Sequence, residues 1–297
     1  MPALQALVAA TDFSPPAERA ADRAAQLAQA AGAPLCLVHS LGAGALADLR
    51  RWLGTDGPAE ALQAQALEQL QAQAEALQRR HGAVVAVHLG DGDVVDDLDT
   101  AAAARGADLL VTGTRGAGLM NGALLGSTAE RVARQAARPV LLVRQGAPGP
   151  YRRVLLALDF SPCANTALAA AATVAPGAEP VLLHVPERPL EGPLRLAGAT
   201  PQTLARYAEA ARTEARQRLQ ALAAAAGLPA DRTRLLLPDG GDPWRRVLEA
   251  QRTLDADLVV VGQQGRRALG SLLLGRTARL VVAECACDVL IVPPPAA

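Results

Sequence analysis

The chain has few aromatic residues and no excess of charge of either sign. Two Trp, two Tyr and two Phe in 297 residues cannot form an extended platform on which nucleic-acid bases stack. The 29 basic and 29 acidic residues balance to a formal net charge of +0, so no overall field attracts nucleic acid or anionic lipid. We therefore expect neither nucleic acid nor a membrane surface as a partner.

Long hydrophobic runs and a cysteine framework are also missing. No apolar run approaches the ~18–20 residues of a membrane span, and the N-terminus lacks the basic segment and apolar core of a secretion signal. The four cysteines do not form a paired framework, and Cys285-Ala286-Cys287 has no second Cys/His pair to complete a zinc site. We expect a soluble cytoplasmic protein with reduced thiols and no metal site of its own.

One glycine pattern occurs twice in the chain. Gly113-Thr114-Arg115-Gly116 is followed, after nine residues, by Gly126-Ser127-Thr128, and the same spacing returns in Gly262-Gln263-Gln264-Gly265 and Gly275-Arg276-Thr277. The Asp-Phe-Ser turn that begins at Asp12 likewise returns at Asp159. Because the length is about twice that of a common domain, we predict two similar domains, residues 1–146 and 151–297, with a Gly/Pro-rich linker at 147–150.

The order of elements in each half predicts an α/β fold. Continuous Val/Leu runs alternate with helical segments, which is typical of parallel strands covered on both faces. In such sheets ligands bind beyond the carboxyl ends of the strands, where Asp12, Asp159 and both glycine loops are expected. Glycines let the backbone approach a ligand closely, and the start of the following helix favours an anion such as phosphate. We therefore predict one phosphate-binding crevice in each domain.

These motifs together resemble the universal stress protein family in its tandem form. The resemblance rests on the G-x2-G-x9-G-[S/T] loop, the Asp-Phe-Ser turn and a second strand that ends in His, and it covers essentially the whole chain. It implies two Rossmann-like domains, each an open five-stranded parallel sheet of strand order 3-2-1-4-5 flanked by helices. It further implies a stress-response regulator that binds ATP or another adenine nucleotide, with any Mg²⁺ held by the phosphates, and that usually has no dedicated catalytic reaction.

The resemblance also assigns roles to individual residues. In the first half Asp12 would contact the ribose and Ser40 the adenine, Gly113 and Gly116 would approach the ribose and α-phosphate, and Gly126, Ser127 and Thr128 would hold the outer phosphates. The corresponding residues of the second half are Asp159, Val185, Gly262, Gly265, Gly275 and Thr277. Arg276 departs from the family's Ser/Thr, so we expect the second site to be empty or weaker.

Other interpretations of the same residues stay open. Asp12 and Asp159 can instead satisfy backbone N–H groups in the turn that enters the first helix, and His39 and His184 lack the neighbouring groups of a catalytic site. An enzyme is disfavoured because neither loop has the lysine of a phosphate-transferring site, so we assign no catalytic residue and expect at most slow ATP hydrolysis. A nucleotide-free interaction module, with a protein partner that the sequence does not identify, is the other alternative.

The last strand of each half predicts how the domains assemble. The segments 139–143 and 289–292 are apolar and end their sheets' strand order, and an unpaired apolar edge favours pairing. Single-domain relatives of this family often pair across their fifth strands. We therefore predict an internal pseudo-dimer through these edges, with further homodimer formation open to the exposed helices.

Overall fold

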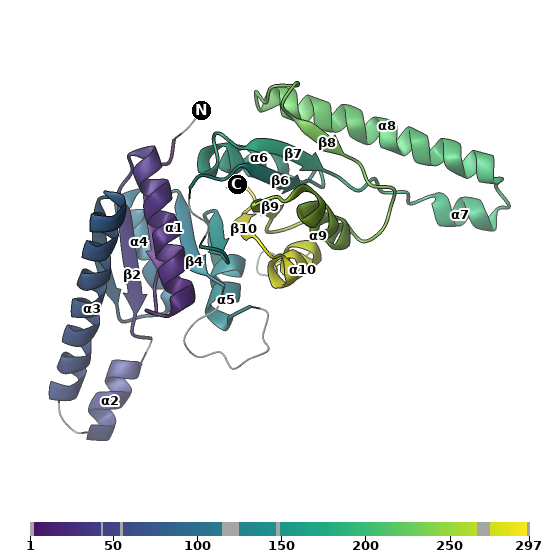
Figure 1. Ribbon diagram of the computed structural model, residues 1–297. Coiled ribbons are helices and arrows are strands. Elements are labelled where there is room, and N and C mark those ends of the chain that lie inside the picture. The colour runs from purple at the N-terminus through teal and green to yellow at the C-terminus, as the bar shows by residue number, and fades with distance from the viewer. Residues whose placement is uncertain are drawn as a thin grey trace.

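The computed structural model describes residues 3–42, 44–53, 56–114, 125–146, 149–265 and 274–295. Strands and helices alternate in both halves (Figure 1). The strands of the N-terminal half are β1 (Leu7–Ala10), β2 (Leu35–Ser40), β3 (Val85–Gly90), β4 (Leu109–Gly113) and β5 (Val140–Val143). Those of the C-terminal half are β6 (Arg153–Ala157), β7 (Glu179–Leu183), β8 (Arg234–Leu236), β9 (Leu258–Gly262) and β10 (Asp288–Val292).

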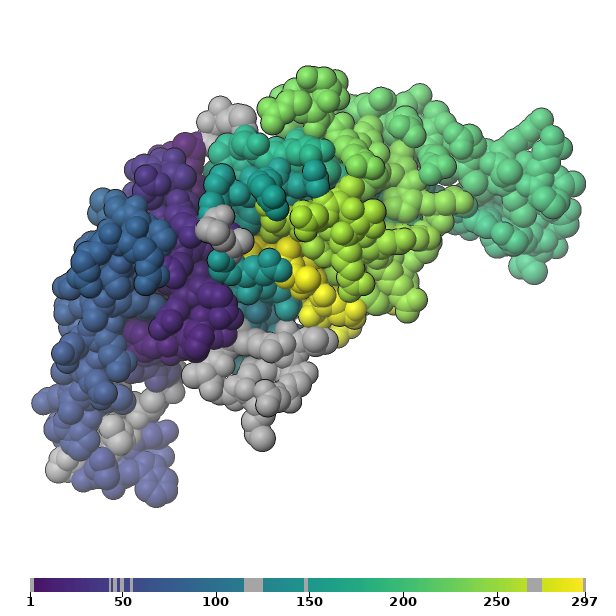
Figure 2. All heavy atoms as spheres, in the orientation of Figure 1, coloured from purple at the N-terminus to yellow at the C-terminus, as the bar shows by residue number. Residues whose placement is uncertain are grey.

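Helices connect these strands. In the N-terminal half they are α1 (Pro15–Ala31), α2 (Ala45–Leu53), α3 (Gly57–His81), α4 (Val94–Arg105) and α5 (Ser127–Gln135). In the C-terminal half they are α6 (Cys163–Val174), α7 (Glu191–Leu196), α8 (Pro201–Ala225), α9 (Pro243–Leu254) and α10 (Arg276–Glu284). The short helices α2 and α7 do not appear in the sequence-based prediction, and they lie at the two outer ends of the molecule (Figures 1 and 2).

The strands form one continuous ten-stranded sheet in the order β3-β2-β1-β4-β5-β10-β9-β6-β7-β8. Each half has the predicted order 3-2-1-4-5 and is parallel throughout. The halves join where β5 and β10 pair antiparallel, with Leu142 opposite Val289 and Leu141 opposite Leu290. The predicted pairing of the two edge strands is confirmed, and it merges the two five-stranded sheets into one.

Helices cover both faces of this sheet, and each face has its own hydrophobic core. One cluster joins α1 and α3 to α6 and α8 across one face, and the other joins α4 and α5 to α9 and α10 across the opposite face. Leu290 belongs to the first cluster and Leu142 to the second, and both are completely buried. Both cores therefore run without interruption from one half of the chain into the other.

Local sequence signals explain where several helices begin and end. Ser14 caps α1 by accepting a hydrogen bond from the Ala17 amide, Pro15 is the first helical residue, and Gly32 ends the helix at φ 65°. Two predicted helices are wrong at both ends, since α5 spans Ser127–Gln135 rather than 128–137 and α10 spans Arg276–Glu284 rather than 277–286. The shift makes Gly126 and Gly275 the N-cap residues.

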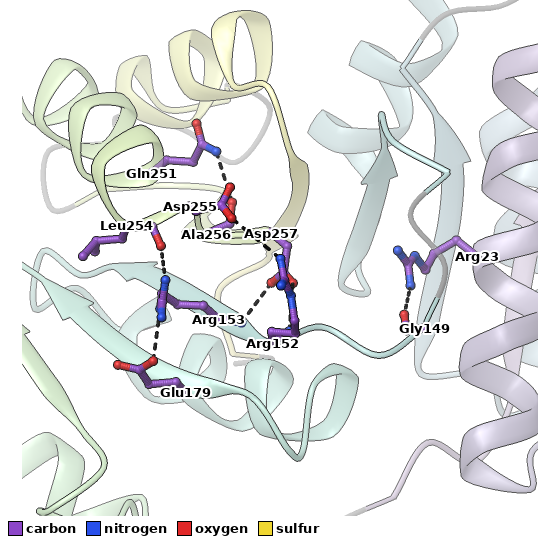
Figure 3. Close-up of polar contacts among 10 residues, drawn as sticks. All are labelled: Arg23, Gly149, Arg152, Arg153, Glu179, Gln251, Leu254, Asp255, Ala256 and Asp257. Atoms are coloured by element: carbon purple, nitrogen blue, oxygen red, sulfur yellow. Dashed lines mark hydrogen bonds and ion pairs between the residues drawn. The ribbon is translucent and has the colours of Figure 1, made fainter.

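A buried polar cluster ties the linker to both halves. Asp288, at the start of β10, accepts hydrogen bonds from the Tyr151 hydroxyl at 2.7 Å and from the Arg144 amide at 2.8 Å. Arg23 of α1 lies 3.6 Å from the Asp288 carboxylate and donates to the Gly149 carbonyl at 2.6 Å (Figure 3). The three side chains of Arg23, Tyr151 and Asp288 are at most 4% exposed, so this cluster holds the junction in one arrangement.

Candidate nucleotide-binding crevices

The turn after the first strand is repeated in both halves with the same backbone strain. Phe13 and Phe160 have φ of 62° and 59°, in the left-handed region that bulky residues rarely adopt. The preceding carboxylates support the turn, because Asp12 Oδ1 accepts from the Ser14 amide at 3.1 Å and Asp159 Oδ1 accepts from the Ser161 amide at 3.0 Å. The structural role considered for these aspartates is therefore present, and any ligand role is additional.

The histidines that follow the second strand support the same turn. His39 Nδ1 lies 2.8 Å from the Thr11 carbonyl and His184 Nδ1 lies 2.7 Å from the Leu158 carbonyl. Since a carbonyl can only accept, Nδ1 is the protonated nitrogen in both rings. The His184 ring packs on Phe160 at a centroid distance of 4.2 Å, and burial lowers the pKa of His184. These contacts hold both imidazoles against the turn, with His184 buried and His39 half-buried.

In the C-terminal half the glycine loop lies close to the turn that follows β6, the first strand of this half. A Cβ atom on Gly265 would lie 3.0 Å from Asp159 Oδ2, and one on Gly275 would lie 3.5 Å from the Gly265 amide nitrogen. The Gly275 amide donates to the Gln263 carbonyl at 2.8 Å, which closes the loop at the start of α10. Three predicted residues that are far apart in the sequence thus meet at one point.

A pocket of about 460 Å³ lies at this point, within the usual range of ligand pockets. All six residues predicted for this half line it: Asp159, Val185, Gly262, Gly265, Gly275 and Thr277. His184, Glu187, Pro243, Val247 and Gln264 line it as well. Pro243 and Val247 lie in the first turns of α9, which follows Gly241-Asp242. This pair repeats Gly92-Asp93 of the N-terminal half, and the repeat is the sequence signal that could have placed them.

Arg276 lines the pocket without filling it. It is the first residue of α10, its side chain is 70% exposed, and its guanidinium lies 3.6 Å from the carboxylate of Asp242, the N-cap residue of α9. In the N-terminal half the corresponding carboxylate, Asp93, pairs with Arg131 instead, and this hydrogen-bonded guanidinium lowers the pKa of Asp93. Each half therefore has an arginine-aspartate pair at this corner, and in the C-terminal half the arginine comes from the position that is Ser127 in the N-terminal glycine motif.

The N-terminal half repeats the closing contact of the loop. The Gly126 amide donates to the Thr114 carbonyl at 2.8 Å, and α5 begins at Ser127 with no side-chain cap on its first amides. Ser127 and Thr128 are exposed there. A Cβ atom on Gly113 would lie 2.9 Å from the Pro16 carbonyl group, so close packing against α1 requires this glycine whether or not a ligand is bound. Gly116 lies outside the described residues.

The region predicted to face the base differs between the halves. Ser40 Oγ donates to Asp97 Oδ2 at 2.6 Å, and a Cβ atom on Gly90 would lie only 2.1 Å from that same oxygen. Asp97 was not predicted, because its contact joins the end of β2 to α4 and has no local sequence signature. Val185 takes the position of Ser40 in the C-terminal half, so an apolar side chain replaces a hydroxyl at that end of the crevice.

Within the described part of the chain, no three His, Cys, Asp or Glu side chains gather closely enough to hold a metal ion. Cys285 and Cys287 are buried at the end of α10 with their sulfur atoms 3.4 Å apart. A search of the described helices finds none that could span a membrane.

Comparison with known proteins identifies the family. The model of the Universal stress protein family matches this chain twice, over residues 4–144 and 150–293. A universal stress protein of Thermus aquaticus is 36% identical over 146 residues, which is 48% of this chain and 98% of that protein. The chain therefore belongs to the universal stress protein family, with two copies of the family domain.

Solved structures support the same fold over the full length. A universal stress protein of Archaeoglobus fulgidus superposes with a TM-score of 0.68 at 19% identity and covers 97% of this chain and 98% of its own. A putative universal stress protein of Pseudomonas aeruginosa gives a TM-score of 0.61 at 20% identity, with 98% and 94% covered. At these identities the likeness concerns the fold and its tandem organisation.

Proposed function

We propose that this protein is a stress-response regulator that binds ATP or another adenine nucleotide, with the phosphates held by the glycine loop and the start of α5 in its N-terminal half. In this proposal Gly126, Ser127 and Thr128 bind the outer phosphates, and Gly113 and Gly116 lie along the ribose and α-phosphate. Asp12 contacts the ribose and Ser40 the adenine. Any Mg²⁺ is bound by the phosphates rather than by a protein site.

The observation that carries the proposal is the convergence of the repeated motif on one pocket. In the C-terminal half, all six residues assigned from the motif line the same cavity. In the N-terminal half the corresponding closing contact, the Gly126 amide on the Thr114 carbonyl, is the same length as that of Gly275 on Gln263. Uncapped amides at the start of α5 and its helix dipole suit an anionic group.

The C-terminal site belongs to the same proposal with a lower affinity. Its pocket has room for a ligand, but Arg276 replaces a small hydroxyl residue and already lies near Asp242. A phosphate that enters must bind beside this guanidinium or displace it from the carboxylate. Val185, Glu187 and Val247 also make the base end different from that of the N-terminal half.

The test is a glycine substitution at the N-terminal phosphate position. Gly126 has φ of −73°, which valine adopts without backbone strain, so Gly126→Val places a branched side chain where phosphate must approach. Circular dichroism checks that the variant is folded. We expect calorimetry to show loss of the tighter ATP site. Gly57→Val is the matched control, because Gly57 also begins a helix of this domain and a Cβ atom there meets nothing within 4 Å.

Unchanged ATP affinity in a folded Gly126→Val variant would reject this site assignment. Mass spectrometry of small molecules released from heat-denatured protein would identify a co-purified nucleotide and separate the proposal from a nucleotide-free interaction module. Phosphate-release assays address hydrolysis, which we expect to be far below the ~1–100 s⁻¹ of kinases because no lysine or evident base is available in the loops.

A further inference from the structure

One side chain of the C-terminal glycine loop, Gln263, contacts the N-terminal half. Gln263 follows the last residue of β9 and is only 5% exposed. Its side-chain amide nitrogen lies 3.1 Å from the Ala133 carbonyl, 2.9 Å from the Arg134 carbonyl and 3.4 Å from the Ala136 carbonyl. The first two oxygens belong to the last turn of α5, where helix carbonyls lack partners within the helix, and the third belongs to its C-cap residue.

The helix that Gln263 holds is the one that begins the N-terminal phosphate site. α5 is nine residues long, with Gly126 as its N-cap and Gln135 as its last residue. A short helix of this kind is marginal on its own and depends on its packing and on its ends. A donor at the C-terminus also complements the helix dipole, so the Gln263 contact stabilises the same backbone whose first amides face the crevice.

The C-terminal end of α10, the helix that corresponds to α5 in the other half, makes a different contact. Thr114 occupies the position of Gln263 in the N-terminal loop, and its side chain is shorter. Instead, the C-terminal end of α10 receives the Arg144 guanidinium, which donates to the Val282 and Ala283 carbonyls. Arg144 lies just after β5 rather than in a glycine loop. Among the described residues, α5 is therefore held by a side chain from the other half's glycine loop, whereas α10 is held by a residue that follows β5.

We propose that Gln263 is a positioning residue for the N-terminal nucleotide site, so that this site reaches full affinity only with the C-terminal domain docked on α5. The inference rests on the proposed nucleotide-binding function for its effect on affinity. The hydrogen bonds to the helix act on α5 whether or not nucleotide is present. These two consequences can be measured separately.

The first measurement is amide hydrogen exchange of residues 127–136 in the full-length protein without nucleotide. Gln263→Glu keeps the size but cannot donate while ionised, and Gln263→Thr introduces the residue of the N-terminal loop. We expect both to speed exchange of this segment about tenfold, since the carbonyls at the end of α5 lose the side-chain amide that donates to them. Gln263→Lys keeps the donors and should remain close to the unmodified protein.

Gln251 provides the matched control. It is a buried glutamine of α9 whose amide donates at 3.1 Å to the Ala256 carbonyl within its own domain (Figure 3). Gln251→Glu should disturb the C-terminal domain and leave exchange of residues 127–136 unchanged. Equal exchange of this segment in Gln263→Glu, Gln263→Thr and the unmodified protein would overturn the proposal, whatever the nucleotide does.

The second measurement is ATP binding by calorimetry in a Val185→Trp background, which fills the C-terminal pocket. We expect Gln263→Thr and Gln263→Glu to weaken the remaining site about three- to tenfold and Gln263→Lys to restore it. A Gln263→Lys protein as weak as Gln263→Thr would show that the donated bonds are not the cause and would overturn the proposal. Absence of ATP binding in the Val185→Trp protein itself would reject the proposed function, while the exchange experiment would still decide the role of Gln263.

Discussion

Replacing the buried carboxylate of Asp288 should loosen the junction between the two halves. Asp288→Asn keeps the size of the side chain but removes the negative charge beside Arg23, at 3.6 Å, and changes the acceptor that Tyr151 and the Arg144 amide use. Asp288 and Arg23 are 2% and 3% exposed, so water cannot solvate the Arg23 guanidinium after its partner carboxylate is removed. The remaining guanidinium would be a buried charge with a weaker set of acceptors.

The expected cost follows from this burial. Removing one member of a buried ion pair typically destabilises a protein by about 3–5 kcal/mol. Here we expect about 3 kcal/mol, because the Gly149 carbonyl and the Gln26 side chain still accept hydrogen bonds from Arg23. Tyr151→Phe removes a single hydrogen bond to the carboxylate, and we expect it to cost about 1.5–3 kcal/mol.

Urea unfolding followed by circular dichroism measures these differences. If the unfolding free energy falls by about 3 kcal/mol per M of urea, Asp288→Asn should lower the urea concentration at the unfolding midpoint by about 1 M. The two halves should then also unfold in separate transitions. Asp255→Asn is the control, since Asp255 is 90% exposed and lies 3.7 Å from Arg152 in a surface pair worth about 0–1 kcal/mol (Figure 3). If Asp288→Asn and Asp255→Asn shifted the midpoint equally, the cluster would not stabilise the junction.

Three further predictions concern the crevices and the shared sheet. Arg276→Ser should raise the affinity or number of bound nucleotides in calorimetry, because it restores a small hydroxyl and frees the corner near Asp242; two equal sites in the unmodified protein would contradict this. Burial lowers the pKa of His184, so the unfolded chain takes up a proton below about pH 6.5 that the folded chain does not. Stability should therefore fall as the pH drops through that range, and His184→Asn should flatten this dependence in urea titrations at several pH values. Leu290→Glu places a charge in a completely buried position opposite Leu141 and should destabilise the joined sheet by several kcal/mol; a midpoint within about 0.5 M of the unmodified protein would refute the importance of this edge.

Much of the fold follows from local signals in the sequence. Buried parallel strands give continuous Val/Leu runs, and Ser14, Pro15 and Gly32 mark the ends of α1 as capping chemistry predicts. The pairing of β5 with β10 also follows, because both are apolar and end the strand order of their halves. The residues of the C-terminal pocket could be predicted because parallel strands bring their carboxyl ends to one edge of the sheet.

What the sequence does not predict lacks a local signal. α7 has six residues and buries none of them, so it has no packed face for the sequence to mark. α2 has nine residues and its Trp52 is 80% exposed, so its apolar residues do not mark a buried face. Gln263 meets α5 across about 130 positions of sequence, and a glutamine beside a glycine loop gives no indication of that distant partner. The pairing of Arg276 with Asp242 is missed for the same reason.

The antiparallel seam between β5 and β10 also affects how the two halves can evolve. In an assembly of two identical subunits, every substitution appears on both sides of the twofold axis, so a contact that favours one side is imposed on the other. Here the two sides are encoded separately, and Gln263 stands at the position that corresponds to Thr114, as Arg276 stands at the position of Ser127. The two crevices of this chain can therefore change independently of each other, whereas those of a symmetric dimer cannot.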